Sequence, residues 1–131
     1  MPKVWLVLVG LLACGCAGQS ASVASIPRFA GTWEGTWTNV ADSTDAGTST
    51  WTVNGDGTVD GHDFDAGRST TFHVVGSISG TGALSSVSTP LTGAAATLNG
   101  PLSLSDNNHL SGVLVWGVSP PLSYQYSFTR K

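Results

Sequence analysis

The feature of this sequence that most constrains its fold is a short pattern that recurs about every 25 residues. Each copy is a four-residue segment whose second residue is apolar, and these apolar residues are Trp33, Val59, Leu84 and Leu110, at spacings of 26, 25 and 26. A turn rich in Asn, Asp or Gly precedes the last three copies, and such turns supply the positive φ that short β-hairpin loops need. One period has room for two strands and two turns, so four periods predict eight strands.

From Phe29 onward, β-branched and aromatic residues alternate with polar ones, which is typical of short antiparallel strands. We therefore predict an all-β fold with strands near residues 32–40, 48–54, 58–65, 70–79, 83–89, 96–105, 109–118 and 123–130. Eight strands can close into a small antiparallel meander barrel, which side chains fill or which holds one small ligand. Closure also removes the sheet edges that promote aggregation. The alternative is an open β-sandwich.

Charge and cysteine content exclude several classes of protein. Only 10% of the residues are charged and the formal net charge is -3, without a cluster of Lys or Arg, so a basic nucleic-acid binder is excluded. The two cysteines, Cys14 and Cys16, are too close together for an ordinary structural disulfide. No nucleophile motif such as G-x-S-x-G is present. We therefore expect a protein that is not an enzyme and that needs no cofactor.

The N-terminal residues have the pattern of an export signal. Lys3 precedes an apolar stretch over residues 4–12, which is too short to span a bilayer but fits the apolar region of a signal peptide. The stretch ends in L-L-A-C, and this ending resembles the bacterial lipobox. The resemblance implies cleavage before Cys14 and lipidation of its thiol. Cys16 is the alternative lipidated residue, and an ordinary cleaved signal peptide is a further alternative.

These features divide the chain into three parts. They are a signal peptide at 1–13, a lipidated cysteine with a small, polar tether at 14–28, and a β-barrel domain at 29–131. Gly15 follows Cys14, whereas an Asp at that place retains lipoproteins at the inner membrane of bacteria with two membranes. The resemblance therefore implies a lipid-anchored protein of the bacterial cell envelope, at the outer membrane.

The start of the β domain carries a second resemblance. The segment F-A-G-T-W, which ends at Trp33, is similar to the F-x-G-x-W opening of lipocalins and related calycins and to the G-T-W start of avidin-like barrels. In those families the Trp plugs the closed end of the barrel, and a basic residue from the last strand packs across it. The resemblance implies these roles for Trp33 and Arg130, whose cation–π contact would contribute about 0.5–2 kcal/mol.

The alternation along the strands predicts which side chains face the interior. The predicted inner surface consists of Trp33, Trp37, Trp51, Val53, Val59, Phe72, Val74, Ile78, Tyr124, Tyr126 and Phe128. A left-handed Gly57 in the hairpin loop would place Val53 opposite Val59 and Trp51 opposite Gly61.

A ligand site needs a few polar groups in an apolar wall. Within the predicted inner surface we therefore expect a ligand to contact Trp37, Trp51, Asp63, Tyr124 and Tyr126. The alternative is that these aromatic side chains simply fill the core.

The strand at 109–118 is apolar on both faces, so its orientation is open. If Val113 and Val115 face inward, Leu114 and Trp116 form a small outward patch. Such a patch would suit a protein partner or the membrane surface.

Two clusters could hold a metal ion. Asp56, Asp60 and Asp63 lie in a segment that partly resembles a calcium loop, but the acidic first position, a second loop and a following helix are absent. A turn at 67–68 places His62 opposite His73 on the outer face of a hairpin, and two ligands are too few for a tight zinc site. We therefore favour hairpin geometry as the role of these residues and expect no metal.

Together these observations predict a membrane-anchored lipoprotein whose small barrel binds a small apolar or aromatic ligand. The alternative is a protein-interaction or structural envelope lipoprotein, such as an inhibitor or accessory protein, with a filled core. Its candidate recognition loops are residues 40–47 and 89–95. A calcium-stabilised surface domain is the third hypothesis.

Overall fold

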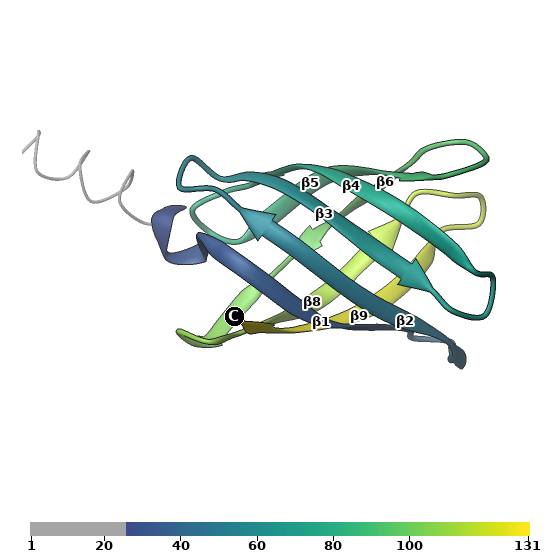
Figure 1. Cartoon of the computed structure of the whole chain (residues 1–131), viewed down its shortest axis with the longest axis horizontal. Helices are drawn as coiled ribbons and strands as arrows, with labels where there is room; N and C mark the ends of the chain where they lie inside the picture. Colours follow the sequence, from purple (N-terminus) through teal and green to yellow (C-terminus); the bar gives the residue numbers. More distant parts are fainter. Residues whose placement is uncertain (1–25) are drawn as a thin grey trace, which may run out of the picture.

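Antiparallel strands account for most of residues 26–131, which are the residues that the computed structural model describes. A short 3-10 helix, η2 (Ile26–Phe29), precedes β1 (Gly31–Asn39), β2 (Asp42–Val53), β3 (Thr58–Asp65), β4 (Thr70–Ile78), β5 (Ala83–Pro90), β6 (Ala96–Pro101), β7 (Ser103–Asp106), β8 (His109–Trp116) and β9 (Leu122–Arg130). The strands pair in the order β6-β5-β4-β3-β2-β1-β9-β8-β7, and pairing of β6 with β8 closes the sheet (Figure 1). The predicted all-β barrel is confirmed, and the open sandwich is wrong. Within this part of the chain, no helix is long and apolar enough to cross a membrane.

The barrel has one more strand than the sequence predicts, because the strand expected at 96–105 is divided into β6 and β7. The division follows Pro101, which has no N–H to donate to a neighbouring strand. Leu98 and Leu102, on either side of the division, are both buried, so the inward alternation continues through it. The two segments therefore act as one bent strand in the barrel wall.

Residues 40–47, expected as a recognition loop, belong almost entirely to β2, which begins at Asp42. The connection from β1 is therefore a tight turn. The Asn39 side chain accepts a hydrogen bond from the backbone N–H of Ala41 at 2.9 Å and fixes this turn. The second expected loop, at 89–95, is shortened to 91–95 because β5 continues to Pro90. Neither segment is the long loop that the sequence suggested.

The predicted register of the first hairpins is confirmed. Gly57 has a φ of +91°, and Val53 pairs with Val59. Trp51 pairs with Gly61, and a Cβ on this glycine would overlap the Trp51 ring. The glycine thus provides the space that a large inward aromatic side chain needs.

The barrel interior is a continuous apolar core. Of the predicted inner surface, only Phe72 is not buried. The remaining core residues, supplied by η2, β5, β6, β8 and the β6–β7 junction, are Phe29, Leu84, Leu98, Leu102, Leu110 and Leu114.

The inward face of β8 is the reverse of the one considered from the sequence. Val113 and Val115 are exposed, at 40% and 42%, whereas Leu114 is buried and Trp116 packs against the core. The cause is the pairing with β9, where Leu114 lies opposite the inward Tyr124. Cross-strand partners share a face of the sheet. The proposed outward patch of Leu114 and Trp116 is therefore wrong.

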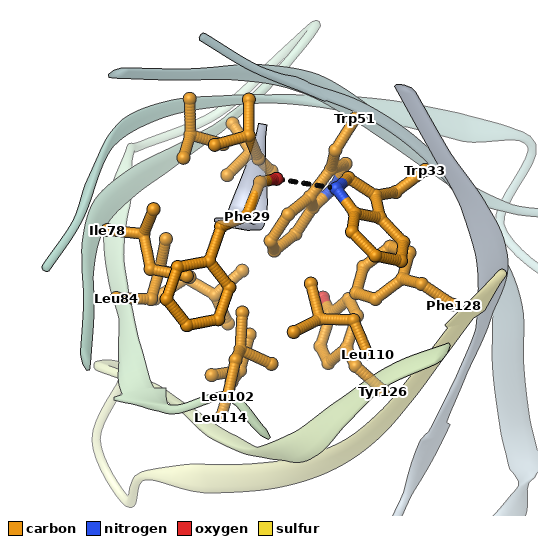
Figure 2. Close-up of a cluster of buried hydrophobic side chains, with 14 of the residues drawn as sticks. Phe29, Trp33, Trp51, Ile78, Leu84, Leu102, Leu110, Leu114, Tyr126 and Phe128 are labelled. Carbon is orange, nitrogen blue, oxygen red and sulfur yellow. Dashed lines mark hydrogen bonds between the residues drawn. The ribbon is translucent and has the colours of Figure 1, made fainter. Parts of the chain in front are cut away.

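One end of the barrel is closed by aromatic packing. Phe29 enters the interior from η2, and its carbonyl accepts a hydrogen bond from the Trp33 indole at 2.9 Å (Figure 2). The Arg130 guanidinium lies 4.2 Å from the centroid of the Trp33 ring. It also donates to the carbonyls of Ala30, Arg28 and Asn107. This is the geometry that the resemblance to lipocalins implies for the Trp and the basic residue.

Candidate functional site

A hollow lies at the opposite end of the barrel from η2. It is lined by Trp37, Asp63, Asp65, Arg68, Phe72, Ser88, Leu98, Trp116, Tyr124 and Tyr126. It contains about 360 Å³ of unfilled space when its open mouth is included, but only about 30 Å³ is wide enough for the centre of a water molecule. Such a space admits roughly two waters. Any larger occupant therefore requires side chains at the mouth to move.

Half of the residues that line the hollow are aromatic. Trp37 and Tyr124 meet edge to face with their centroids 5.3 Å apart. Phe72 and Trp116 meet in the same way at 5.8 Å, and Trp116 lies 6.4 Å from Tyr124. Edge-to-face packing is favourable for aromatic pairs and holds the rings in defined orientations. The four rings thus form a connected aromatic wall.

Asp63 lies at the inner limit of the hollow and is almost completely buried. Its Oδ1 accepts hydrogen bonds from the Ser49 hydroxyl and the Trp51 indole, both at 2.7 Å, and its Oδ2 accepts one from the Tyr126 hydroxyl at 2.6 Å. Burial raises the pKa of Asp63, and the three donors act in the opposite direction. Burial and the charge of Asp63 raise the pKa of Tyr126 well above 10. Asp63 therefore organises the floor of the hollow.

A second polar network lies at the mouth. Oδ2 of Asp45 accepts hydrogen bonds from the Asn39 amide at 3.0 Å and the Tyr124 hydroxyl at 3.1 Å. Burial, followed by the charge of Asp45, raises the pKa of Tyr124 to about 12. The Arg68 guanidinium lies 3.0 Å from the buried Asp65 carboxylate and 3.7 Å from Asp45. With 58% of its side chain exposed, Arg68 is the charged lining residue that is in contact with solvent.

Two donors at the hollow have no acceptor. The indole N–H groups of Trp37 and Trp116 are buried, and no oxygen or nitrogen of residues 26–131 accepts a hydrogen bond from either. Buried indole N–H groups usually have a partner. By contrast, Trp33 and Trp51 both donate within the barrel. The unused donors therefore occur only in the tryptophans that line the hollow.

The structure brings together most of the ligand contacts expected from the sequence. Trp37, Asp63, Tyr124 and Tyr126 all line the hollow. Trp51 does not line it. Its ring packs against Phe128 at a centroid distance of 4.8 Å, and its indole N–H donates a hydrogen bond to Asp63.

Other lining residues were not expected from the sequence. The sequence indicates an outward Trp116 if Val113 and Val115 face inward, and Asp65 and Arg68 lie in a segment that the sequence predicts to be a turn. Pairing the predicted 109–118 strand with the inward Tyr124 would have identified Trp116. No sequence signal indicates that Arg68 spans Asp65 and Asp45, because these contacts depend on the three-dimensional arrangement of β2 and β3.

The weak calcium site considered from the sequence is not formed. Asp63 points into the barrel, whereas Asp60 is exposed on the other face of β3 and bonds to His73 at 2.8 Å. Asp56 accepts hydrogen bonds from Thr58 within its own turn. His62 and His73 lie opposite each other as predicted, with stacked rings 4.9 Å apart. Within residues 26–131, no three His, Cys, Asp or Glu side chains form a group that could hold a metal ion.

No protein-family model matches this chain. Neither a curated protein nor a solved structure matches it. The functional inference therefore depends on the chemistry of the barrel itself.

Proposed function

We propose that this protein is a lipid-anchored envelope protein whose barrel binds a small apolar or aromatic ligand in the hollow. The observation that carries the proposal is the difference between the two ends of the barrel. The η2 end is filled by Phe29 and Trp33 and covered by Arg130. The other end has an aromatic wall, a buried carboxylate and a mouth. An apolar concavity with a few placed polar groups is the usual form of a small-molecule site.

The size of the hollow sets a condition on this proposal. The space present takes only the innermost group of a ligand, since about 30 Å³ admits roughly two waters. The rest of the molecule would lie in the mouth, and Arg68 would swing into solvent to admit it. This movement would break the ion pair of Arg68 with the buried Asp65 carboxylate as well as its longer contact with Asp45, so the incoming ligand or water has to solvate Asp65.

Occupancy can be tested by native mass spectrometry of gently purified protein. We expect a reproducible added mass of a small molecule. Ser88→Phe would fill the hollow and remove this mass, since Ser88 is buried and lines it. Ser85→Phe is the matched control, because Ser85 lies on the same strand and is exposed. A bare mass for the wild type, or equal occupancy in both folded variants, would contradict the proposal.

The anchor is supported by the sequence alone and lies outside the described residues. We propose that Cys14 is the lipidated residue, with residues 15–25 as the tether, since residues 26–28 belong to η2. Metabolic labelling with a radioactive fatty acid should label the wild type and Cys16→Ser but not Cys14→Ser. Labelling that is lost only in Cys16→Ser would move the anchor to that residue. An unlabelled wild type would overturn the anchor but not the ligand site.

A second candidate function is recognition of another envelope protein through the barrel exterior. It is favoured by the exposed cross-strand partners Val75 and Val87, together with Val113 and Val115. Asp106 is the only Asp, Glu, Lys or Arg between residues 69 and 129, so this part of the wall is almost free of charge. A crosslink to one envelope protein that Val87→Asp abolishes, combined with a bare native mass, would favour this function over ligand binding.

A further inference from the structure

The unused hydrogen-bond donors of the hollow specify what its ligand carries. We infer that the ligand is an uncharged aromatic molecule with an oxygen or ring-nitrogen acceptor, which the indole N–H groups of Trp37 and Trp116 bind. This inference rests on the proposed function, because it assumes that the hollow is a ligand site.

The hydrogen-bond donors and acceptors of the hollow do not balance. Both oxygens of Asp63 already accept hydrogen bonds, and both oxygens of Asp65 accept from Arg68. The Tyr124 and Tyr126 hydroxyls are also donating. What the hollow lacks is an acceptor for its two free indole N–H groups. A purely hydrocarbon ligand would leave both donors buried and unsatisfied, which is costly.

The charge at the hollow decides between a neutral and an ionic ligand. Three carboxylates, Asp45, Asp63 and Asp65, lie at or beside the hollow, and Arg68 is the one cation among its lining residues. An anionic ligand would enter a site with excess negative charge and low dielectric constant, where repulsion is strong. A cation would meet favourable charge, but an ammonium group has only donors and cannot accept from either indole. An uncharged acceptor satisfies both constraints.

The shape of the aromatic wall favours a planar ligand. The rings of Trp37 and Tyr124 and those of Phe72 and Trp116 each meet at 87°, so the wall presents both ring faces and ring edges. A planar aromatic ring can pack against such a wall by stacking and by edge-to-face contact. Both indole nitrogens are buried in the present arrangement, so the acceptor on that ring would reach them only after the side chains at the mouth have moved. An aromatic carbonyl compound is the simplest chemistry of this type.

Four probes of one ring size test the inference. They are acetophenone, with a neutral acceptor; toluene, without one; benzoate, an anion; and benzylammonium, a cation. Titration would follow the indole N–H signals in ¹H–¹⁵N spectra of the labelled protein. We expect acetophenone to bind about tenfold more tightly than each of the other three. It should shift the Trp37 and Trp116 indole protons downfield and leave those of Trp33 and Trp51, which are already hydrogen-bonded, nearly unchanged.

Two variants complete the test. Trp37→Phe and Trp116→Phe keep an aromatic side chain but remove one donor and some ring area, and each should weaken acetophenone binding about 3- to 10-fold more than it weakens toluene binding. Equal loss for both probes would show that only packing is affected and would overturn the inference.

The outcomes separate the inference from the proposed function. If toluene, benzoate or benzylammonium binds as tightly as acetophenone, or if acetophenone binds without moving the two indole signals, the inference is wrong but the hollow is still a ligand site. If none of the four probes binds and the native mass is bare, both the inference and the proposed ligand site are wrong. If none binds to protein from which a bound molecule has been removed, the inference is wrong but the ligand site stands.

Discussion

Removal of the Arg130 side chain tests how the closed end of the barrel is held together. In Arg130→Ala the guanidinium is lost from the Trp33 ring, where it lies 4.2 Å from the centroid. Three backbone carbonyls also lose their donor, including that of Asn107 at 2.7 Å and that of Arg28 at 3.0 Å. Two of these carbonyls belong to the segment that carries Phe29 into the core, so the variant also loosens the attachment of η2.

The size of the effect follows from these contacts. A cation–π contact of this geometry contributes about 1 kcal/mol. Hydrogen bonds from a charged donor contribute more than neutral ones, but the partly exposed guanidinium exchanges part of that gain with water, which leaves about 2 kcal/mol for the carbonyl contacts. We therefore expect Arg130→Ala to lower the free energy of unfolding by about 3 kcal/mol. For a domain of this size, that corresponds to a fall in Tm of about 12 °C.

Lys131→Ala is the matched control, because Lys131 is the next residue and carries the same charge. Its ammonium group forms an exposed ion pair with Glu34 at 2.8 Å, which is worth about 0.2–1 kcal/mol. Thermal unfolding followed by tryptophan fluorescence and by circular dichroism would compare the two variants. Arg130→Lys should lie between them, since it keeps a cation but loses the planar fork. Equal Tm values for Arg130→Ala and Lys131→Ala would refute this model of closure.

Two further predictions concern the interior. Gly61→Ala should destabilise the fold by about 1–3 kcal/mol in a urea melt, because the added Cβ would overlap the Trp51 ring, whereas Gly55→Ala meets no atom within 4 Å and should change little. Burial raises the pKa of Asp63 above its ordinary value of 3.8, so the folded state binds a proton more tightly than the unfolded state, and this group's contribution to stability improves as the pH falls from neutral towards 3.8. Asp63→Asn lacks this contribution, so the difference in Tm should move in favour of the wild type on acidification; movement in the other direction would count against a raised pKa.

The sequence was sufficient to predict the barrel and much of its register, because both depend on local signals. The turn around Gly57 fixes the pairing of Val53 with Val59, and the turn at 67–68 fixes the pairing of His62 with His73. Each register follows from the number of residues in one hairpin. The side-chain alternation of period two then assigns most of the inner face.

The orientation of β8 could not be predicted in this way. Both faces of this strand are apolar, so its side-chain pattern does not show which face points inward. Its inward face is decided by β9, whose alternation is clear and which places Leu114 opposite Tyr124. The start of β2 was missed for a related reason. Residues 42–47 are small and polar, and they are held as a strand by pairing with β1 and by the contacts of Asp45 with Asn39 and Tyr124.

The four tryptophans of the barrel give the clearest reason to place function at the open end. All of their indole nitrogens lie inside the barrel, so burial alone does not distinguish them. Trp33 donates to the carbonyl of Phe29, and Trp51 donates to Asp63. Trp37 and Trp116 have no acceptor in the described part of the chain, although carboxylates lie in the same hollow and are bonded to other donors. If the barrel served only as a filled scaffold, an apolar ring such as Phe at these two positions would avoid the cost of an unsatisfied N–H. The two unsatisfied donors belong to residues that line the hollow, and this is why we propose that end of the barrel as the site for an acceptor-bearing ligand.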